Sequence, residues 1–131
     1  MIKPSSLKLE EAFSNSDIIV DAMIGYGISG PLRGSIQNAV SILSNYSSKI
    51  IISLDAPTGF RFNEKNEPSF VVHATATLTL ALPKKGMNDS KNREILGDLY
   101  LGDISVPPML YEKMGIPYSD PFKSSNYIRI P

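Results

Sequence analysis

The chain has 131 residues, of which 42% are hydrophobic and 20% are charged, so its length and composition are those of one ordinary globular domain. Its 13 basic and 13 acidic side chains cancel at neutral pH, which excludes a strong global attraction to nucleic acid or to anionic membranes. The absence of cysteine excludes disulfides and thiol nucleophiles but does not identify a compartment. No apolar run approaches the roughly 20 residues of a membrane-spanning helix, and the first residues lack the apolar segment of a secretory signal, so we expect a cytoplasmic protein.

In chain order, the first predicted element is a short helix over residues 7–13. A strand over residues 18–24 follows, and it is apolar on both faces apart from Asp21, which is typical of a buried parallel strand. A glycine-rich loop then leads into a helix whose predicted N-cap is Ser35. The apolar face of that helix consists of Ile36, Ala39, Val40 and Leu43.

The next strand, residues 49–54, runs directly into Asp55-Ala-Pro-Thr-Gly59, so the two strands and the helix between them form a βαβ unit with parallel strands. A polar stretch over residues 61–69 predicts a surface loop or hairpin. Residues 75–82 alternate threonine with leucine, which predicts a strand with one more polar face. The remaining predicted elements are a loop over residues 84–94, short strands at 99–101 and 127–130, and a helix over 107–114. Together these elements predict a three-layer α/β domain.

The loop after the first strand contains Gly25, Gly27 and Gly30, spaced as in a dinucleotide-binding turn. Pro31 follows directly and delays the next helix, so the loop is longer than a Rossmann turn and a dehydrogenase is disfavoured. Glycines let backbone amides approach an anion closely. The sequence leaves two interpretations open, an anion-binding loop and a set of tight turns without a ligand.

Two acids accompany this loop. Asp55 ends the second strand, so it should face the same crevice as the glycine loop, because parallel strands meet the same sheet edge with their carboxyl ends. Asp21 lies within an apolar strand, where a carboxylate is costly unless it is hydrogen-bonded or bound to a cation. Either it bonds neighbouring backbone amides, or it binds a cation together with the Thr58 hydroxyl and main-chain carbonyls. His73 has no second histidine or cysteine to share a metal and is interpreted as a structural or surface residue.

Taken together, the chain resembles the NAD(P)H-hydrate epimerase family, the YjeF N-terminal domain. The resemblance rests on five stretches in the family's order: residues 17–27, 30–34, 52–59, 74–84 and 97–104. It implies a Rossmann-like three-layer α/β/α sandwich with a mostly parallel sheet, usually a homodimer. Residues 1–131 would form a single partial domain of this kind, because the Gly- and Asn-rich phosphate loop of the family's first half has no counterpart here.

The resemblance also implies a function in metabolite repair, the interconversion of the R and S forms of hydrated NADH and NADPH. A partner dehydratase would then restore the S form. Asp55 would contact the substrate and act as the catalytic acid or base. Asp21 and Thr58 would hold one potassium ion per subunit, although the family more often has serine where this chain has Thr58. The loop around the substrate would consist of Gly25, Tyr26, Gly27, Ile28, Ser29, Gly30 and Pro31.

Two further expectations follow from the missing first half. The chain would need that N-terminal portion or would associate with itself, because half a sheet leaves an exposed strand edge that invites pairing. A non-catalytic dimerisation or interaction module of the same fold is the alternative to an epimerase. The retained Asp21, Asp55 and glycine loop favour the enzyme, because a pure scaffold has no need of a buried acid.

Overall fold

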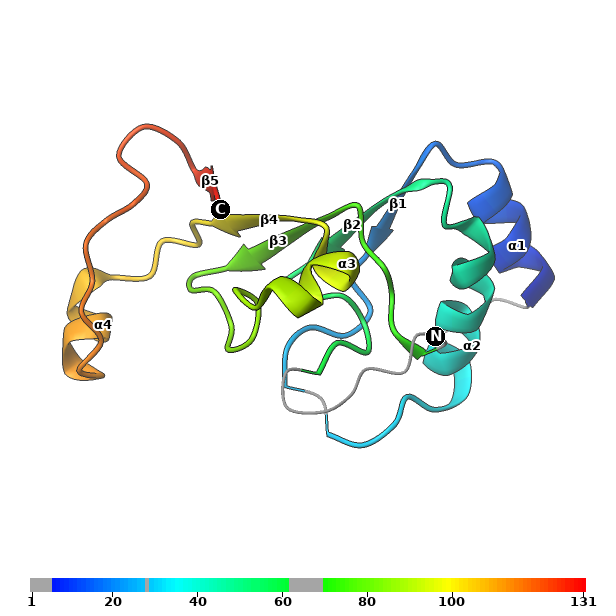
Figure 1. Cartoon of the computed structure of the whole chain (residues 1–131), viewed down its shortest axis with the longest axis horizontal. Helices are drawn as coiled ribbons and strands as arrows, with labels where there is room; N and C mark the ends of the chain where they lie inside the picture. Colours follow the sequence, from blue (N-terminus) through cyan, green and yellow to red (C-terminus); the bar gives the residue numbers. More distant parts are fainter. Residues whose placement is uncertain (1–5, 28, 62–69) are drawn as a thin grey trace.

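The computed structural model describes residues 6–27, 29–61 and 70–131 and contains a five-stranded sheet in the order β1-β2-β3-β4-β5 (Figure 1). The first four strands are parallel, and the last is antiparallel to its neighbour. The strands are β1 (Ile18–Asp21), β2 (Ile50–Leu54), β3 (Ala76–Leu80), β4 (Asp98–Gly102) and β5 (Tyr127–Arg129). The mostly parallel sheet that the sequence predicted is confirmed.

The predicted βαβ unit consists of β1, α2 (Gly34–Leu43) and β2, with Ile18 paired to Ile50. The N-cap of α2 is Arg33 in an extended conformation, so the predicted N-cap at Ser35 is wrong and the helix starts without a side-chain cap. β1 is shorter than predicted, because the Asp21 carboxylate accepts the N–H of Met23 and turns the chain away from the sheet. The 3₁₀ turn η1 (Ser44–Tyr46) closes the helix.

The alternating strand β3 turns its polar side inward. Thr77 and Thr79 are completely buried, while Leu78 and Leu80 on the opposite face are partly exposed. The Thr77 hydroxyl is satisfied by the carbonyl oxygen of Leu96, at 2.7 Å. That carbonyl belongs to α3 (Arg93–Leu96), which with η3 (Ser90–Asn92) occupies the end of the predicted loop, so the loop prediction is wrong there. Leu96 of this short helix is buried in the core.

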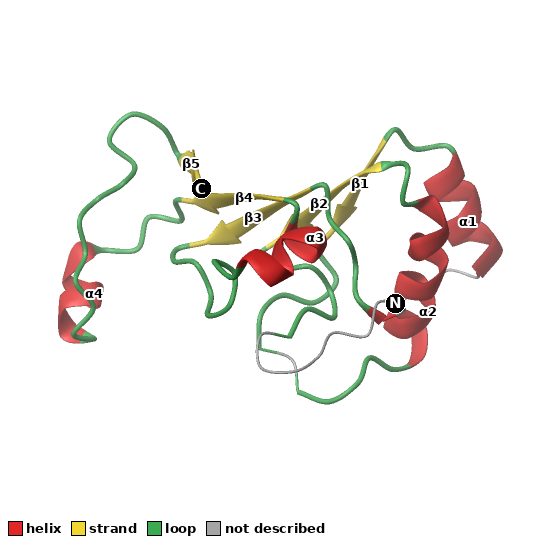
Figure 2. Cartoon of the chain, in the orientation of Figure 1, coloured by secondary structure: helices red, strands yellow, loops and turns green. Residues whose placement is uncertain are grey.

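The two faces of the sheet differ in what covers them. On the covered face, Ile19 and Ile51 pack against Val40 and Leu43 of α2, and Leu99 packs against Leu96 of α3. Figure 2 shows α2 and α3 on the same side of the sheet, with no helix of the described residues on the other side. We call that other side the open face; it carries Ile18, Val20, Ile50, Ile52, Leu54, Leu78 and Leu80.

The remaining helices lie at the two ends of the molecule. The predicted N-terminal helix is confirmed as α1 (Ser6–Ser14), which is fixed to the α2–η1 region by the edge-on contact of Phe13 with Tyr46, ring centroids 5.7 Å apart. The predicted helix near residue 107 is confirmed as α4 (Pro108–Lys113), which stands away from the sheet (Figure 1). Ring stacking of Tyr111 on Tyr118, at 4.3 Å, ties α4 to the segment that leads to β5.

The predicted surface loop over residues 61–69 lies outside the described residues except for Arg61. Within the described part of the chain, every helix is too short or too polar to cross a lipid bilayer.

Gly97, between α3 and β4, adopts φ 62°, and a Cβ atom there would lie 2.2 Å from the carbonyl oxygen of Thr75. We expect Gly97→Ala to lower the free energy of unfolding by about 3 kcal/mol or more, because the added methyl group must displace backbone as well as adopt a left-handed conformation. The control is Gly115→Ala, at φ 67° with open space around it, which should cost only about 1–2 kcal/mol. Urea denaturation followed by circular dichroism measures both, and equal losses would show that the Thr75 contact does not constrain the fold.

Candidate functional site

A buried carboxylate joins the first two strands at their carboxyl ends. Asp21 is 2% exposed, and its Oδ2 accepts the backbone N–H of Thr58 at 2.8 Å and the hydroxyl of Ser53 at 2.9 Å. Its Oδ1 accepts the Thr58 hydroxyl at 2.6 Å. Such a group is tolerated in an apolar interior only when hydrogen bonds replace its lost hydration. Asp21 therefore fixes the turn after β2 to the end of β1.

The first interpretation of Asp21, a carboxylate bonded to neighbouring backbone amides, accounts for part of its contacts, and two hydroxyls supply the rest. The second interpretation, a cation ligand, is compatible with the donor atoms. The Thr58 hydroxyl oxygen lies 2.6 Å from Asp21 Oδ1 and 3.2 Å from the carbonyl oxygen of Ile24. Three hard oxygen donors thus converge, and this is the donor set that hard cations prefer. The described residues contain no cluster of three or more His, Cys, Asp or Glu side chains suited to a metal.

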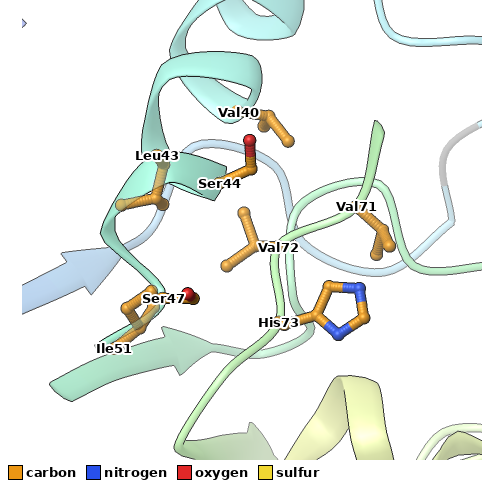
Figure 3. Close-up of a pocket in the computed structure, with 8 residues that line it drawn as sticks. All are labelled: Val40, Leu43, Ser44, Ser47, Ile51, Val71, Val72 and His73. Carbon is orange, nitrogen blue, oxygen red and sulfur yellow. The ribbon is translucent and has the colours of Figure 1, made fainter. Parts of the chain in front are cut away.

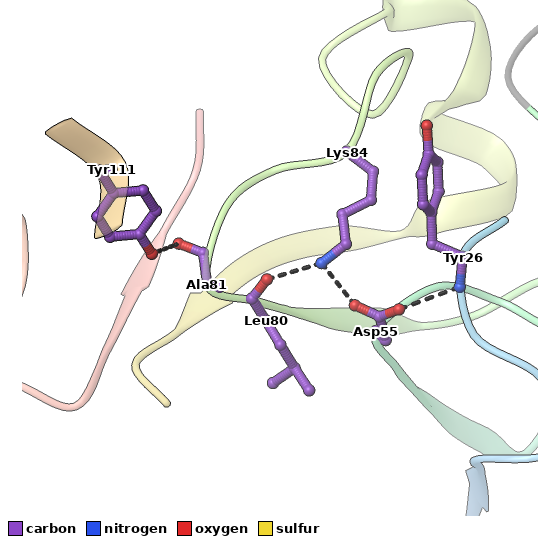
Figure 4. Close-up of polar contacts among 6 residues, drawn as sticks. All are labelled: Tyr26, Asp55, Leu80, Ala81, Lys84 and Tyr111. Carbon is purple, nitrogen blue, oxygen red and sulfur yellow. Dashed lines mark hydrogen bonds and ion pairs between the residues drawn. The ribbon is translucent and has the colours of Figure 1, made fainter. Parts of the chain in front are cut away.

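The second acid, Asp55, lies at the same end of the sheet between two partners (Figure 4). Its Oδ2 accepts the backbone N–H of Tyr26 at 3.0 Å, and its Oδ1 lies 2.6 Å from Lys84 Nζ. Lys84 also donates to the carbonyl oxygen of Leu80 at 2.7 Å. The structure thus brings the glycine loop and the Asp55 turn together, as the parallel arrangement of their strands predicted.

The pKa of Asp55 reflects opposing effects. Partial burial is the largest single effect and raises the pKa of the carboxyl group. The hydrogen bond from Lys84, the hydrogen bond from the Tyr26 N–H and the charge of Lys84 together outweigh it, so the pKa lies below the ordinary value of 3.8. Asp55 is therefore an anion at neutral pH.

Lys84 is the site residue that the sequence interpretation missed. Short pairs of lysines such as Lys84-Lys85 are usually solvated, but the Lys84 side chain is only 18% exposed, which is too little for a solvated surface lysine. The available signal was its place directly after Pro83, at the carboxyl end of the strand beside β2, which is the edge where Asp55 lies.

The backbone around this ion pair is unusual. Asp55 and Ala81 both adopt left-handed conformations, at φ 66° and 65°, which non-glycine residues occupy rarely and which often accompany functional sites. Each is held by a sheet-like hydrogen bond, from the N–H of Asp55 to Leu78 at 2.8 Å and from that of Ala81 to Gly102 at 3.1 Å. The two turns are thus fixed by the sheet itself.

The glycine loop packs closely against Asp55 at Gly25, whereas Gly27 and Gly30 have open space around them. A Cβ atom on Gly25 would lie 2.7 Å from Asp55 Oδ2, so only glycine permits this approach. Gly27 and Gly30 adopt φ 96° and 77°, and Arg61, which the sequence did not single out, donates to the carbonyl oxygen of Gly30. Tyr26, Ser29 and Pro31 are exposed, and Ile28 lies outside the described residues.

Beside the ion pair lies an open cavity of about 410 Å³. Tyr26 and the β3 end form one part of its lining, and α4 with the segment before it forms another. The cavity is lined by Tyr26, Leu80, Ala81, Leu82, Pro83, Lys84, Lys85, Val106, Leu110, Tyr111 and Met114. Its walls are mainly apolar with two lysines at one side, which suits a ligand that has both a planar ring and anionic groups.

His73 lies away from this site. It borders a small cavity of about 80 Å³ between the end of α2 and residues 71–73, where its neighbours are mostly aliphatic (Figure 3). The histidine is half-buried. This position agrees with the structural role that the sequence suggested.

We expect Lys84→Met to raise the pKa of Asp55 toward the ordinary carboxyl value, because it removes both the hydrogen bond and the positive charge that lower it. The depressed pKa stabilises the wild-type fold at pH values above about 4, and this contribution is lost as the pH falls through the folded-state pKa. The stability difference between wild type and variant should therefore be largest near pH 7 and shrink in acid. Carbon-detected NMR titration and urea denaturation measure the two effects.

Lys91→Met is the matched control, because it removes a lysine of equal charge whose partner, Asp89, is half exposed. It should leave the pKa of Asp55 unchanged. A Lys84→Met variant with the wild-type pKa at Asp55 would mean that the ion pair does not exist in solution.

Comparison with known proteins places this chain in a family. The model of the YjeF-related protein N-terminus family matches residues 2–86. The NAD(P)H-hydrate epimerase of Truepera radiovictrix is 38% identical over 97 residues, which cover 74% of this chain and 42% of that protein. The epimerase of Dehalogenimonas lykanthroporepellens is 34% identical over 116 residues, covering 88% and 45%. The chain thus spans less than half the length of these relatives.

Two further similarities extend this result. The bifunctional NAD(P)H-hydrate repair enzyme Nnr of Thermofilum pendens is 35% identical over 115 residues, which cover 86% of this chain and 22% of that enzyme. A crystal structure of the yeast protein ynu0 superposes with a TM-score of 0.73 at 20% identity over 92% of this chain and 50% of the yeast chain, which confirms the Rossmann-like α/β fold. Because the family model matches more than half of its residues, the chain belongs to the YjeF-related protein N-terminus family.

Proposed function

We propose that the chain provides part of the active site of an NAD(P)H-hydrate epimerase, an isomerase that interconverts the R and S forms of hydrated NADH and NADPH. The observation that carries this proposal is the ionised Asp55, fixed between Lys84 and the N–H of Tyr26 at the carboxyl end of a parallel sheet. The names of the relatives supply the substrate class.

In this proposal the substrate lies across the glycine loop and the adjoining cavity. Gly25, Tyr26, Gly27, Ile28, Ser29, Gly30 and Pro31 form the loop that approaches its phosphates. Backbone amides in such loops bind anions without a charged side chain. Arg61, bonded to the carbonyl oxygen of Gly30, adds a positive charge beside the loop.

Epimerisation requires the bond between the ring carbon and its hydroxyl oxygen to break and to form again on the opposite face. The hydroxyl group takes a proton from solvent and leaves as water; water then adds to the opposite face and returns a proton to solvent, so the redox state of the ring is unchanged. A fixed carboxylate stabilises the positive charge that this cleavage leaves on the ring, and it accepts a hydrogen bond from the departing oxygen. Asp55 has both properties, and Lys84 is the positioning residue that keeps it ionised and oriented.

We further propose that Asp21 and Thr58 hold a potassium ion together with the carbonyl oxygen of Ile24. The convergent oxygen atoms described above and the absence of any cationic partner for Asp21 among the ion pairs of the described residues support this assignment. A bound monovalent cation would offset the charge of Asp21 and of the substrate phosphates. We also propose that the protein forms a homodimer in the cytoplasm. A dehydratase that acts on the S form would be its functional partner.

The alternative function is a non-catalytic interaction module. The half-buried ion pair at the sheet edge and the strained turns that present it argue against this alternative, because a docking scaffold gains nothing from them.

We expect Asp55→Asn to lower epimerase turnover by at least about 10²-fold, because the amide keeps the shape of the side chain but lacks its charge. Chiral chromatography measures conversion of the R form of hydrated NADH. The variant is assayed in the same preparation in which the wild-type chain is active. Asp89→Asn, at an exposed acid that pairs with Lys91, is the control and should retain full activity.

A binding measurement distinguishes an epimerase from an interaction module even when the chain shows no turnover. Under the epimerase proposal, hydrated NADH raises the melting temperature of both wild type and Asp55→Asn, and intact NADH does so less. Wild-type activity in Asp55→Asn would remove this carboxylate from the reaction. A melting temperature that hydrated NADH leaves unchanged would favour the interaction module.

Potassium binding at Asp21 and Thr58 gives a separate prediction. Potassium chloride should raise the melting temperature of the wild-type chain more than lithium chloride at the same ionic strength, by roughly 4 °C for each kcal/mol that potassium binding adds to the free energy of unfolding. Thr58→Val removes one oxygen ligand at nearly constant volume and should abolish the difference between the salts. Identical melting curves of the wild-type chain in both salts would refute the potassium site.

A further inference from the structure

Strand β3 ends in a strained turn centred on Ala81. The N–H of Leu82 donates to the carbonyl oxygen of Leu80 at 2.8 Å, and Ala81 between them adopts φ 65°. A hydrogen bond from residue i+2 back to residue i around a central residue of positive φ marks the rarer and more strained form of γ-turn. Strand β2 ends in the same way, since the residues on either side of Asp55, at φ 66°, share such a bond at 2.9 Å. Turns of this kind persist where surrounding contacts hold them in place.

The two turns differ in what stabilises them. The Asp55 turn is held by its own side chain, whose carboxylate oxygens contact Lys84 and the N–H of Tyr26. The central residue of the second turn, Ala81, has only a methyl group, so its backbone makes the stabilising contacts. Its N–H is bonded to β4 at 3.1 Å, and its carbonyl oxygen accepts the hydroxyl of Tyr111 at 3.4 Å (Figure 4). Tyr111 therefore contacts this turn from outside the sheet.

The Ala81 turn also determines where Lys84 lies. The carbonyl oxygen of Leu80 accepts two hydrogen bonds, one from the Leu82 N–H that closes the turn and one from the Lys84 ammonium group at 2.7 Å. The same ammonium group lies 2.6 Å from Asp55 Oδ1. If the turn relaxes, the Leu80 carbonyl changes direction, and the ammonium group loses the acceptor that holds it beside Asp55. The geometry of the turn is thus coupled to the ion pair.

Tyr111 is itself held firmly in position. Of the six residues of α4, all of which the structure describes, Tyr111 alone is buried, at 5% exposed. Its ring stacks on Tyr118, with the centroids 4.3 Å apart and the planes inclined by 14°, which restricts its rotation. The adjacent Met109 and Leu110 are 59% and 48% exposed, so α4 contributes little to the core. The one buried side chain of this helix is directed at the candidate site (Figure 4).

We propose that Tyr111 is a positioning residue of the candidate site, which fixes the Ala81 turn and thereby keeps Lys84 against Asp55. Tyr111 lies outside residues 2–86, which the family model matches, so this role goes beyond the features that assign the chain to its family. It requires no contact between Tyr111 and a ligand. The consequence for turnover rests on the proposed function, whereas the consequence for the ion pair does not.

The variant that tests this role is Tyr111→Phe, and its matched control is Tyr46→Phe. Each removes one hydroxyl group that donates to a backbone carbonyl oxygen, that of Ala81 in the first case and that of Glu10, at 3.1 Å, in the second. Tyr46 joins η1 to α1, at the other end of the molecule from α4 (Figure 1). Each substitution deletes a single oxygen atom, so a general loss of stability would appear in both variants.

The pKa of Asp55, measured by carbon-detected NMR titration, is the main readout. Tyr111→Phe should raise it toward the ordinary carboxyl value, because a less firmly held Lys84 lowers it less. Hydrogen exchange of the Leu82 N–H should become faster, because the turn that this group closes opens more often. Tyr46→Phe should change neither quantity. A wild-type pKa of Asp55 in Tyr111→Phe would overturn the proposal.

A second comparison shows whether Tyr111 acts through the lysine. In Lys84→Met the ion pair is already absent, so adding Tyr111→Phe should leave the pKa of Asp55 where Lys84→Met alone puts it. An equal rise in both backgrounds would overturn the proposal, because Tyr111 would then affect Asp55 without Lys84. Should Tyr111→Phe fail to fold, Tyr118→Leu takes its place, since it removes the stacked ring and leaves the hydroxyl group. This variant must also raise the pKa of Asp55 for the proposal to stand.

Turnover of the same variants is a separate readout. In a preparation in which the wild-type chain is active, Tyr111→Phe should lower kcat about two- to tenfold, the change that loss of one neutral hydrogen bond produces. KM should stay unchanged, because no contact with the substrate is lost. A raised pKa of Asp55 with an unchanged kcat would support the positioning role but would count against Asp55 in the proposed reaction.

Discussion

The candidate site depends on one buried carboxylate. Asp21 ends β1, and its bonds to Ser53 and Thr58 hold the turn after β2 in place. That turn presents Asp55, and the chain leaving β1 presents Tyr26, whose N–H bonds Asp55. The Thr58 hydroxyl also accepts the N–H of Ile24, so both turns are anchored to the same two residues. Together with the pairing of β1 and β2, this link holds the two loops at the distance that the Asp55 contacts require.

Much of this arrangement was predictable from the sequence, because it follows from local rules. Apolar strands separated by an amphipathic helix give a βαβ unit, and the carboxyl ends of its strands must share an edge. This places Asp55 beside the glycine loop before any coordinates are known. Among residues 6–27, 29–61 and 70–131, no strand pairs with the outer edge of β1, which agrees with the open strand edge expected from the sequence. These predictions succeeded because each depends on sequence periodicity and on chirality, which are properties of short segments.

What the sequence did not predict depends on contacts between distant segments. The alternating pattern of β3 shows that one face is polar, but only the acceptor carbonyl of Leu96 makes it favourable to bury Thr77. Lys84 resembles a surface lysine until the sheet brings it to Asp55, which is 29 positions earlier. The position of the α2 cap was missed because Arg33 enters the helix with no side-chain bond, so no cap motif marks it. Contacts with distant segments determine the positions of Thr77 and Lys84, and these contacts cannot be read from a short stretch of sequence.

Asp55 shows what the left-handed turn after β2 achieves. Its backbone is fixed at φ 66° by the bond from its N–H to Leu78, and both carboxylate oxygens have partners before any ligand is present. The loss of conformational entropy that accompanies ordering of this side chain is therefore incurred during folding. A ligand that meets Asp55 encounters a preorganised acceptor, and the binding energy of its remote groups remains available for catalysis.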